Sequence, residues 1–201
     1  MLPLKDSLLT RFKNLVPSNK VALFLLKLLA LYLIWAVLYV YMDGTESQSF
    51  FVKLWYGGYH ILLKSAMFLS IQLSSAITDI PITSTYREII LENHGTLFIG
   101  NACLCADVMF LFAAFIVAYP GQRKAKLWFI PMGILAIHMI NILRISALCS
   151  TKIYYPEMMN INHKYIFNII VFAFVFILWL IWITRFSEVD LLNKNTVKKD
   201  H

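Results

Sequence analysis

Three side chains suited to nucleophilic chemistry are spread along the second half of this sequence: the Cys103 thiol, the Arg144 guanidinium and the His163 imidazole. A thiolate is a strong nucleophile, an imidazole transfers protons near neutral pH, and a fixed cation stabilises both a thiolate and a developing oxyanion. Each of the three lies within or beside a long apolar stretch, where ionisable groups are rare and commonly functional. The elements that carry these residues therefore decide whether the chemistry is possible.

The amino-acid composition is that of a membrane protein. Of the 201 residues, 60% are hydrophobic and 14% are charged, a balance that a water-soluble domain of this size could not expose. In a membrane chain the net charge of +7 is expected to gather in cytoplasmic loops, so nucleic-acid binding is not the first interpretation. The sequence has few glycines and prolines and no internal repeat. These features favour a single membrane-embedded domain that comprises residues 1–201.

Four stretches are predicted to be transmembrane helices, namely 21–42, 103–119, 127–149 and 165–183. A span needs about 20 predominantly apolar residues. The second stretch is short, but the helix stop and basic turn at 120–126 that follow it favour a span. The first is typical of an uncleaved anchor, because its apolar run is long and no small-residue cleavage site follows it. The predicted fold is an all-α polytopic membrane protein.

The stretch 50–76 is also apolar, but Lys53, Gly57, His60 and Lys64 recur within it at spacings of four, three and four. That spacing places the four residues on one face of a helix. We therefore expect an interfacial amphipathic helix that lies along the membrane surface rather than a fifth span. A re-entrant hairpin broken at the two adjacent glycines is the alternative.

Short β-prone runs at 87–92 and 96–99 flank Asn93, His94 and Gly95. Such runs on either side of a turn that contains Asn and Gly are typical of a β-hairpin. We expect a short hairpin on the outer face of the membrane, which delivers the chain directly to the first cysteine.

The distribution of basic residues predicts the orientation in the membrane. With four spans, the N-terminal segment 1–20, the turn at 120–126 and the tail 185–201 share one side. That side holds eleven Lys and Arg residues against five on the other, and the positive-inside rule assigns it to the cytoplasm. Both termini are therefore expected to be cytoplasmic, with the thiol, the guanidinium and the imidazole near the outer boundary.

Three cysteines leave at least one thiol outside any intramolecular disulfide. Cys103 and Cys105 are two positions apart, so in one continuous helix their side chains point about 200° from each other. Only one of them can then face the arginine and the histidine. Cys149 ends the third predicted span on the side expected to be oxidising, where a disulfide with Cys105 and a buried structural thiol are the two alternatives.

Taken together, these residues resemble the signatures of the exosortase/archaeosortase family. The family's Cys motif resembles residues 101–103, its Asn-x-x-Arg motif resembles 141–144, and its His resembles His163, with Phe167 and Asn168 behind it. Order, spacing and expected membrane depth all agree. The resemblance extends from about residue 85 to residue 183 and is closest to the short exosortases of flavobacterial type.

The sequence departs from the family pattern directly after the position of the nucleophile. Leu104 and Cys105 follow Cys103, where the family usually has a small or polar residue. The match of Asn101 and Ala102 to the family motif selects Cys103 over Cys105 as the expected nucleophile.

The resemblance implies a membrane-embedded cysteine protease/transpeptidase of the bacterial cytoplasmic (inner) membrane, with its active site on the outer face. It implies Cys103 as nucleophile, His163 as acid/base, Arg144 as electrostatic stabiliser and Asn141 as a supporting residue. The implied substrates are exported proteins with a C-terminal sorting signal: a short motif, a hydrophobic span and a basic tail. Cleavage through a thioester would pass the new carboxyl end to a surface acceptor. No cofactor or metal is implied.

Asp107 lies one turn after Cys103 on nearly the same helix face. A carboxylate inside a membrane is costly unless it is paired. His138, Asn141 and Arg144 recur at intervals of three in the third predicted span, so we expect Asp107 to hydrogen-bond with one of them and to hold Arg144 in place. Asp107 is thus predicted to support the site without taking part in the chemistry.

Two other functions stay open at this point. In the first, the chain is a non-catalytic membrane carrier or subunit in which Asp107, His138, Asn141 and Arg144 line a polar path. In the second, the chain is a family member that only binds sorting signals, which the unusual Leu-Cys pair after Cys103 makes plausible. A carrier would depend on these polar side chains and not on the thiol. A protein that only binds sorting signals would form no thioester.

Overall fold

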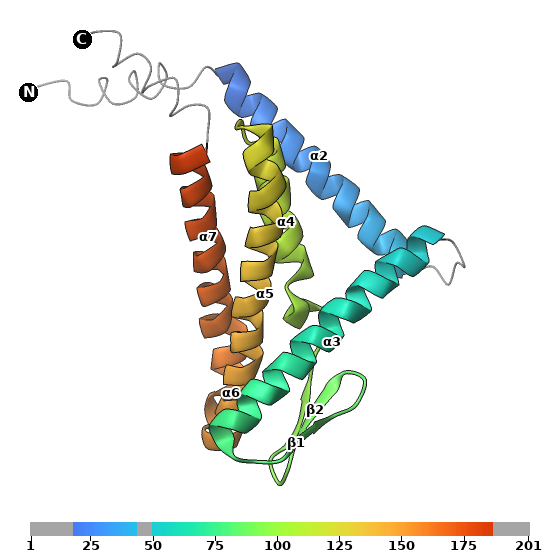
Figure 1. Cartoon of the computed structure of the whole chain (residues 1–201), viewed down its shortest axis with the longest axis vertical. Coiled ribbons are helices and arrows are strands. Elements are labelled where there is room, and N and C mark those ends of the chain that lie inside the picture. Colours follow the sequence, from blue (N-terminus) through green and yellow to red (C-terminus); the bar gives the residue numbers. More distant parts are fainter. Residues whose placement is uncertain (1–17, 44–49, 187–201) are drawn as a thin grey trace, which may run out of the picture.

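The structure, a computed structural model, describes residues 18–43 and 50–186. Its long helices are α2 (Ser18–Asp43), α3 (Phe50–Thr78), α5 (Arg123–Tyr154) and α7 (Phe167–Phe186), with the shorter helix α4 (Ala106–Ala118) among them (Figure 1). Four helical segments are long and apolar enough to cross a membrane: α2, α3, α5 and the segment Pro156–Phe186, which ends in α7. The chain is a mostly helical, multi-pass membrane protein, as predicted.

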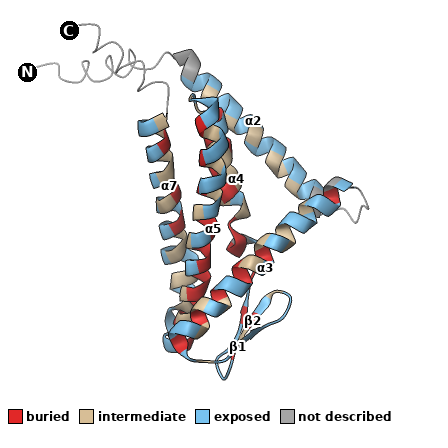
Figure 2. Cartoon of the chain, viewed as in Figure 1, coloured by how far each residue is buried: buried red, intermediate tan, exposed pale blue. Residues whose placement is uncertain are grey.

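Helices α4, α5 and α7 pack side by side, and α2 and α3 lean against them. In Figure 1, α2 and α3 run obliquely to the other helices, with α2 packed on α4 and α3 packed on α5. None of the residues 21–41 of α2 is buried, whereas buried side chains gather on α5 and on parts of α3 and α4 (Figure 2). The core that holds the candidate residues is therefore built by α3, α4, α5 and α7.

Helix α3 is continuous from Phe50 to Thr78, so the alternative of a re-entrant hairpin broken at Gly57 and Gly58 is wrong. A glycine within a helix costs only about 1 kcal/mol relative to alanine, and the apolar packing of α3 on α5 outweighs that cost. The predicted polar stripe points outward, since Lys53 and Lys64 are exposed. The helix is nevertheless long and apolar enough to cross a membrane. The polar stripe alone favours a helix on the membrane surface instead.

The predicted span 103–119 is not a single helix. Its first residues belong to a 3₁₀ turn, η1 (Asn101–Leu104), and only the part from Ala106 onward is α-helical. At about 1.5 Å per residue α4 rises about 20 Å, less than a hydrocarbon core about 30 Å thick. Lys126 ends the helix by donating from Nζ to the carbonyl oxygens of Val117 and Tyr119, at 3.0 and 2.7 Å. The prediction of one full-length span is wrong, because a turn that carries Cys103 replaces its first part.

Gly133 allows α5 to approach α4 closely. A Cβ atom at this position would lie 2.2 Å from Cζ of Phe112 on α4, so only glycine leaves room for the ring. Phe112 is fully buried at this contact. The small residue therefore fixes how α4 sits against α5.

Replacing Gly133 by alanine is expected to lower the free energy of unfolding by about 1–3 kcal/mol, because the added methyl group must displace the Phe112 ring. Thermal unfolding in detergent micelles would measure the loss. Gly57→Ala is the matched control, since nothing lies within 4 Å of a Cβ atom there, and its stability should be equal or slightly higher. Equal melting temperatures for the two variants would contradict the close packing.

A three-stranded antiparallel sheet in the order β1-β2-β3 lies at one end of the bundle. Strands β2 (Glu88–Leu91) and β3 (Gly95–Phe98) form the predicted hairpin, and Asn93 and Gly95 adopt positive φ angles of 61° and 81° in its turn. Strand β1 (Ile82–Ser84) is an addition that the sequence pattern does not indicate. The buried strand residues pack in one core with α3 and α5: Ile89, Leu91 and Leu97.

The bundle has two distinct ends in Figure 1. The start of α2, the α4–α5 turn and the end of α7 lie at one end, and the sheet lies at the other with η2 (Pro156–Met158) and α6 (Met159–Ile161). Between Arg123 and Arg144, α5 rises about 31 Å, which matches a hydrocarbon core about 30 Å thick. The segments 1–20 and 185–201, predicted to be cytoplasmic, lie largely outside the described residues.

Candidate active site

Cys103 and His163 meet in the structure, with Cys103 Sγ 3.5 Å from Nε2 of His163. Cys103 lies in η1, where its N–H donates to the carbonyl of Gly100 at 3.0 Å, and only 5% of its surface is exposed. His163 is half-buried and belongs to a π-helical turn, η3 (Asn162–Ile166), directly before α7. Such turns are frequent at functional sites. At this distance an imidazole can exchange a proton with a sulfur.

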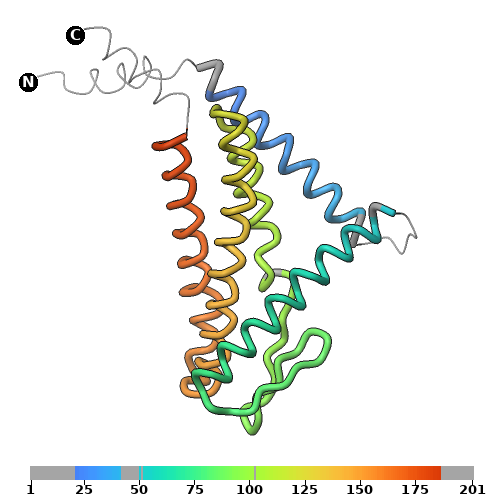
Figure 3. The backbone as a smooth tube through the Cα atoms, viewed as in Figure 1, coloured from blue at the N-terminus to red at the C-terminus, as the bar shows by residue number. Residues whose placement is uncertain are grey.

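The two cysteines do not lie in one continuous α-helix, which corrects the expectation that their side chains point apart. Cys105 has φ 55° and ψ 23°, the left-handed conformation, and joins η1 to α4. A non-glycine residue in this conformation costs about 1–3 kcal/mol. Cys103 and Cys105 are both only 5% exposed, so both thiols face the interior. Figure 3 traces the chain from the sheet through this turn into α4.

Asn141 on α5 binds both cysteine residues. Its Nδ2 donates to the carbonyl oxygen of Cys103 at 2.8 Å, and its Oδ1 accepts from the thiol of Cys105 at 3.2 Å. The side chain is fully buried, and both ends of its amide are hydrogen-bonded. Asn141 is therefore a positioning residue that holds η1 and Cys105 against α5.

Arg144 lies nearly one turn further along α5 and is buried, with 6% of its surface exposed. Its Nη1 donates to Sγ of Cys105 at 3.6 Å. In the described part of the chain its Nε has no hydrogen-bond partner, and no carboxylate contacts the guanidinium. A buried cation without a counter-ion is strongly disfavoured. The site is therefore suited to an anion, either a thiolate or the oxyanion of a carbonyl under attack.

The two thiols have different partners within one cluster. Cys103 contacts the imidazole of His163, and Cys105 contacts the guanidinium of Arg144 and the amide of Asn141. Arg144 is near enough to His163, and Cys103 to Cys105, for a charge on one group to influence the other. The structure thus brings together the predicted thiol, imidazole and guanidinium. It adds the thiol of Cys105, which contacts both Arg144 and Asn141.

Asp107 does not contact His138, Asn141 or Arg144, so the predicted hydrogen bond is not formed. It is exposed, and its Oδ1 accepts a hydrogen bond from Nε1 of Trp35 on α2 at 3.1 Å. The spacing of four from Cys103 does not place both on one face, because helix α4 begins only after the left-handed residue between them. Asp107 therefore fastens α2 to α4 instead of supporting Arg144.

Asp107→Asn is expected to leave the melting temperature nearly unchanged, because the amide oxygen can still accept the hydrogen bond from Trp35. Asp107→Ala removes the acceptor and is expected to cost about 1 kcal/mol of stability. Thermal unfolding in detergent micelles would compare the two variants. A fall of several degrees for Asp107→Asn would mean that the carboxylate charge has a further partner.

His138 is directed to α3, where its Nε2 lies 3.1 Å from Oγ of Ser65. Among the residues considered for a polar path, Asp107 therefore has its partner on α2, His138 on α3, and Asn141 in the turn before α4. These different directions give no support to one continuous path through the bundle.

All three cysteines are free, so the alternative of a disulfide between Cys105 and Cys149 is wrong. Cys149 is fully buried in the core and packs in the same cluster as Ile145 and Leu148. It behaves as a small apolar side chain, which is the usual role of a buried free cysteine.

A second polar cluster surrounds Asn101, at the start of η1, and sequence patterns did not identify it. Asn101 Oδ1 accepts hydrogen bonds from Nη1 of Arg87 at 2.8 Å and from the hydroxyl of Tyr59 at 2.5 Å. Its Nδ2 donates to the hydroxyl of Tyr39 at 3.1 Å. The available signal was Arg87 itself, the one Lys or Arg in the predicted hairpin.

Comparison of the chain with protein-family models, with curated proteins and with solved structures finds no match. The function of the cluster around Cys103 is therefore inferred from its own geometry and from the chemistry of its side chains.

Proposed function

We propose that the chain is a membrane-embedded cysteine protease/transpeptidase that works by acyl transfer through a thioester. The observation that carries this proposal is the 3.5 Å contact of Cys103 Sγ with Nε2 of His163, beside a buried arginine that has no counter-ion among the described residues. A nucleophile within reach of an acid/base, with a fixed cation nearby, is what acyl transfer needs. The resemblance of these residues to the exosortase/archaeosortase motifs supports the same chemistry.

In the first step, His163 takes the proton of the Cys103 thiol, and the sulfur attacks the carbonyl carbon of a peptide bond. The negative charge that develops on the carbonyl oxygen is stabilised by the guanidinium of Arg144. His163 then gives the proton to the leaving amine as the C–N bond breaks. The acyl part of the substrate stays on the sulfur as a thioester.

In the second step, an acceptor nucleophile attacks the thioester carbonyl and loses its proton to His163. The C–S bond breaks, the sulfur leaves as a thiolate, and the proton held by His163 restores the thiol of Cys103. An amine acceptor yields a new amide bond, which is transpeptidation, and water yields a free carboxylate, which is proteolysis.

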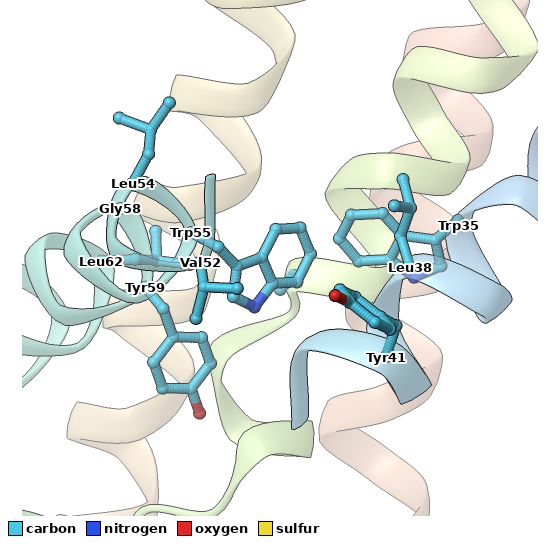
Figure 4. A pocket seen from close by; sticks show the side chains of 10 residues that line it. Trp35, Leu38, Tyr41, Val52, Leu54, Trp55, Gly58, Tyr59 and Leu62 are labelled. Atoms are coloured by element: carbon cyan, nitrogen blue, oxygen red, sulfur yellow. The ribbon is translucent and has the colours of Figure 1, made fainter. Parts of the chain in front are cut away.

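The substrates that we propose are exported proteins with a C-terminal sorting signal made of a short motif, a hydrophobic span and a basic tail. An apolar cavity of about 730 Å³ between α2 and α3 supports this choice (Figure 4). Trp35 and Leu38 line it from α2, Trp55 and Leu62 from α3, and Ala106, the residue after Cys105, lines it from α4. An apolar segment held in this cavity would end close to η1.

We propose that the chain resides in the inner membrane with both ends in the cytoplasm. Basic residues of the turn at 120–126 lie at the same end of the bundle as the start of α2 and the end of α7 (Figure 1), and the positive-inside rule favours the cytoplasm for that end. Cys103 and His163 then lie toward the outer face, where exported proteins are met.

Hydroxylamine trapping tests the thioester. Membranes that contain the chain and an exported reporter with an apolar C-terminal span and a basic tail are treated with hydroxylamine, which attacks thioesters. We expect a shortened reporter with a hydroxamate at its new C-terminus, identified by mass spectrometry. A reporter that keeps its tail, or loses the tail without gaining a hydroxamate, would overturn the proposal.

His163→Gln is the matched variant for this experiment, because glutamine is close in size to histidine but cannot act as an acid or a base. The yield of hydroxamate is expected to fall at least about 100-fold. A full yield from this variant would remove His163 from the proposed mechanism.

A further inference from the structure

The thiol of Cys105 is a buried nucleophilic group that the acyl-transfer steps above do not use. It donates to Oδ1 of Asn141 at 3.2 Å and accepts from Nη1 of Arg144 at 3.6 Å. Burial disfavours the thiolate, which is the reactive form of cysteine, whereas a guanidinium beside the sulfur favours it. Cys105 is therefore placed to react when a strong electrophile forms next to it.

The backbone brings the two cysteines to a separation that permits a bond between their sulfurs. Leu104 alone lies between them, and it is the last residue of the 3₁₀ turn η1. In such a turn, Cα atoms two positions apart are about 5–6 Å from each other. Disulfides span Cα separations of about 4.4–6.8 Å. The left-handed conformation of Cys105 then directs its thiol into the same cluster as that of Cys103.

A disulfide across a single intervening residue is suited to reversible chemistry. So short a ring departs from the preferred geometry of a disulfide, and strained disulfides are readily reduced. Structural disulfides have the opposite property, because they resist reduction. Both thiols are free in the structure. The pair therefore fits a bond that forms and breaks with the redox conditions.

The partners of the two thiols divide the roles between them. Cys103 has an imidazole 3.5 Å from its sulfur, so it is the thiol that loses its proton and meets an oxidant first. Cysteines that sense oxidants commonly have a second, resolving cysteine beside them, and Cys105 has that place. In the orientation proposed above, the pair lies toward the outer side of the membrane, where thiols are not kept reduced.

We propose that Cys103 and Cys105 form a redox switch, in which a peroxide oxidises Cys103 and Cys105 captures the oxidised sulfur as a disulfide. The disulfide removes the nucleophile and stops acyl transfer until a dithiol reduces it. The effect on activity rests on the proposed function, whereas the chemistry of the two thiols does not.

The first step oxidises Cys103. His163 takes the proton of the Cys103 thiol, and the sulfur attacks one oxygen of hydrogen peroxide. The S–O bond forms, the O–O bond breaks, and the leaving hydroxide takes the proton from His163 and becomes water. Cys103 is then a sulfenic acid.

The second step resolves the sulfenic acid. The sulfur of Cys105, stabilised as a thiolate by Arg144, attacks the sulfur of Cys103. The S–S bond forms, the S–O bond breaks, and the hydroxide leaves as water with the proton of the Cys105 thiol. A dithiol reverses the oxidation by thiol–disulfide exchange and becomes a disulfide itself. Without Cys105, further peroxide would convert the sulfenic acid into a sulfinic acid, which a dithiol does not reduce.

Thiol counting tests the disulfide. The full chain in detergent micelles is treated with a small excess of hydrogen peroxide, freed of peroxide, unfolded and alkylated with N-ethylmaleimide. We expect alkylation at Cys149 alone, with a disulfide inside the peptide that carries Cys103 and Cys105, identified by mass spectrometry. Treatment with dithiothreitol before alkylation should restore all three thiols. A disulfide to Cys149, or between two copies of the chain, would overturn the inference.

Cys105→Ser is the variant that removes the resolving thiol, because its hydroxyl can still donate to Asn141 but cannot form a disulfide. Dimedone, which traps sulfenic acids, should label Cys103 of this variant at least about tenfold more than Cys103 of the wild type. Dithiothreitol should restore processing of the reporter by the oxidised wild type and not by the oxidised variant. Cys149→Ala is the matched control and should behave like the wild type. Equal labelling or equal recovery of Cys105→Ser and the wild type would contradict a resolving role.

Phenylarsine oxide measures the proximity of the thiols without oxidation, because it bridges two neighbouring sulfurs. In the folded wild type and in Cys149→Ala it should protect Cys103 and Cys105 from N-ethylmaleimide. In Cys105→Ser it should leave Cys103 unprotected. Lack of protection in the wild type would mean that the two sulfurs are too far apart for the switch.

These measurements separate failure of the switch from failure of the proposed function. A reversible disulfide between Cys103 and Cys105 in a chain that cleaves no reporter would support the thiol pair although the proposed function fails. Reporter cleavage that peroxide abolishes irreversibly in the wild type and in Cys105→Ser alike would leave the proposed function standing and overturn the switch.

Discussion

Replacement of Cys103 by alanine is expected to lower processing of a tagged sorting-signal reporter by about a thousandfold or more, as loss of a nucleophile does. Cys103 is the thiol that has an imidazole within reach. Cys105→Ala should cost no more than about tenfold, because its thiol contacts Asn141 and Arg144 and has no acid/base partner in the described part of the chain. Membrane immunoblots that follow loss of the C-terminal tail would measure both variants.

Cys149→Ala is the control for these two variants, because its thiol is fully buried and takes no part in the hydrogen bonds that join Cys103 and Cys105 to His163, Asn141 and Arg144. It should process the reporter like the wild type. If the Cys105→Ala variant were inactive and the Cys103→Ala variant active, Cys105 would be the nucleophile instead. Unchanged processing with both variants would end the proposal of a thioester.

Replacement of Arg144 by methionine is expected to change activity and stability in opposite directions. Processing should fall about 100- to 1000-fold, because the oxyanion loses its cation. The melting temperature should be equal or higher, because the variant removes a buried charge whose Nε has no partner in 18–43 or 50–186. The reporter assay and thermal unfolding in detergent micelles would measure the two effects on the same preparation.

Arg144→Lys separates the effect of charge from that of geometry. Lysine keeps the positive charge but not the planar fork of donors, so we expect a loss of at least about tenfold. A structural arginine would behave differently: Arg144→Met would then unfold at a clearly lower temperature while processing stayed normal.

Much of the fold follows directly from local sequence signals. Helices α2, α5 and α7 coincide with long apolar runs, and the hairpin coincides with the Asn-His-Gly turn between β-prone residues. Strand β1 (Ile82–Ser84) has only three residues and pairs with β2, with Ile82 opposite Leu91. So short a strand depends on its tertiary partner rather than on a pattern of its own.

One backbone angle accounts for three errors in the prediction of the site. Because Cys105 is left-handed, α4 is shorter than a span, both thiols face the interior, and Asp107 points to α2. No residue-type preference places a cysteine at positive φ, so helical periodicity carried across this position gives wrong directions. The contacts that hold the turn, such as Asn141 with the carbonyl of Cys103, form only in the folded bundle.

The meeting of Cys103 with His163 could be predicted, because both residues adjoin apolar runs at the same expected depth. A few helices in so short a chain leave few ways to keep such residues apart. The cluster around Asn101 could not, since its partners Tyr39, Tyr59 and Arg87 come from three elements far apart in the sequence. Only their packing reveals that they share one pocket.

Helix α5 holds α4 at both of its ends. Lys126 binds the carbonyl groups at the end of α4, and Asn141 binds the turn that precedes it. These two attachments are about 22 Å apart along α5, so α5 fixes the height of Cys103 relative to the end of the bundle that holds the α4–α5 turn. A sorting signal whose span is lengthened by one helical turn would present its scissile bond about 5 Å too high, and cleavage should fail although the motif itself is intact.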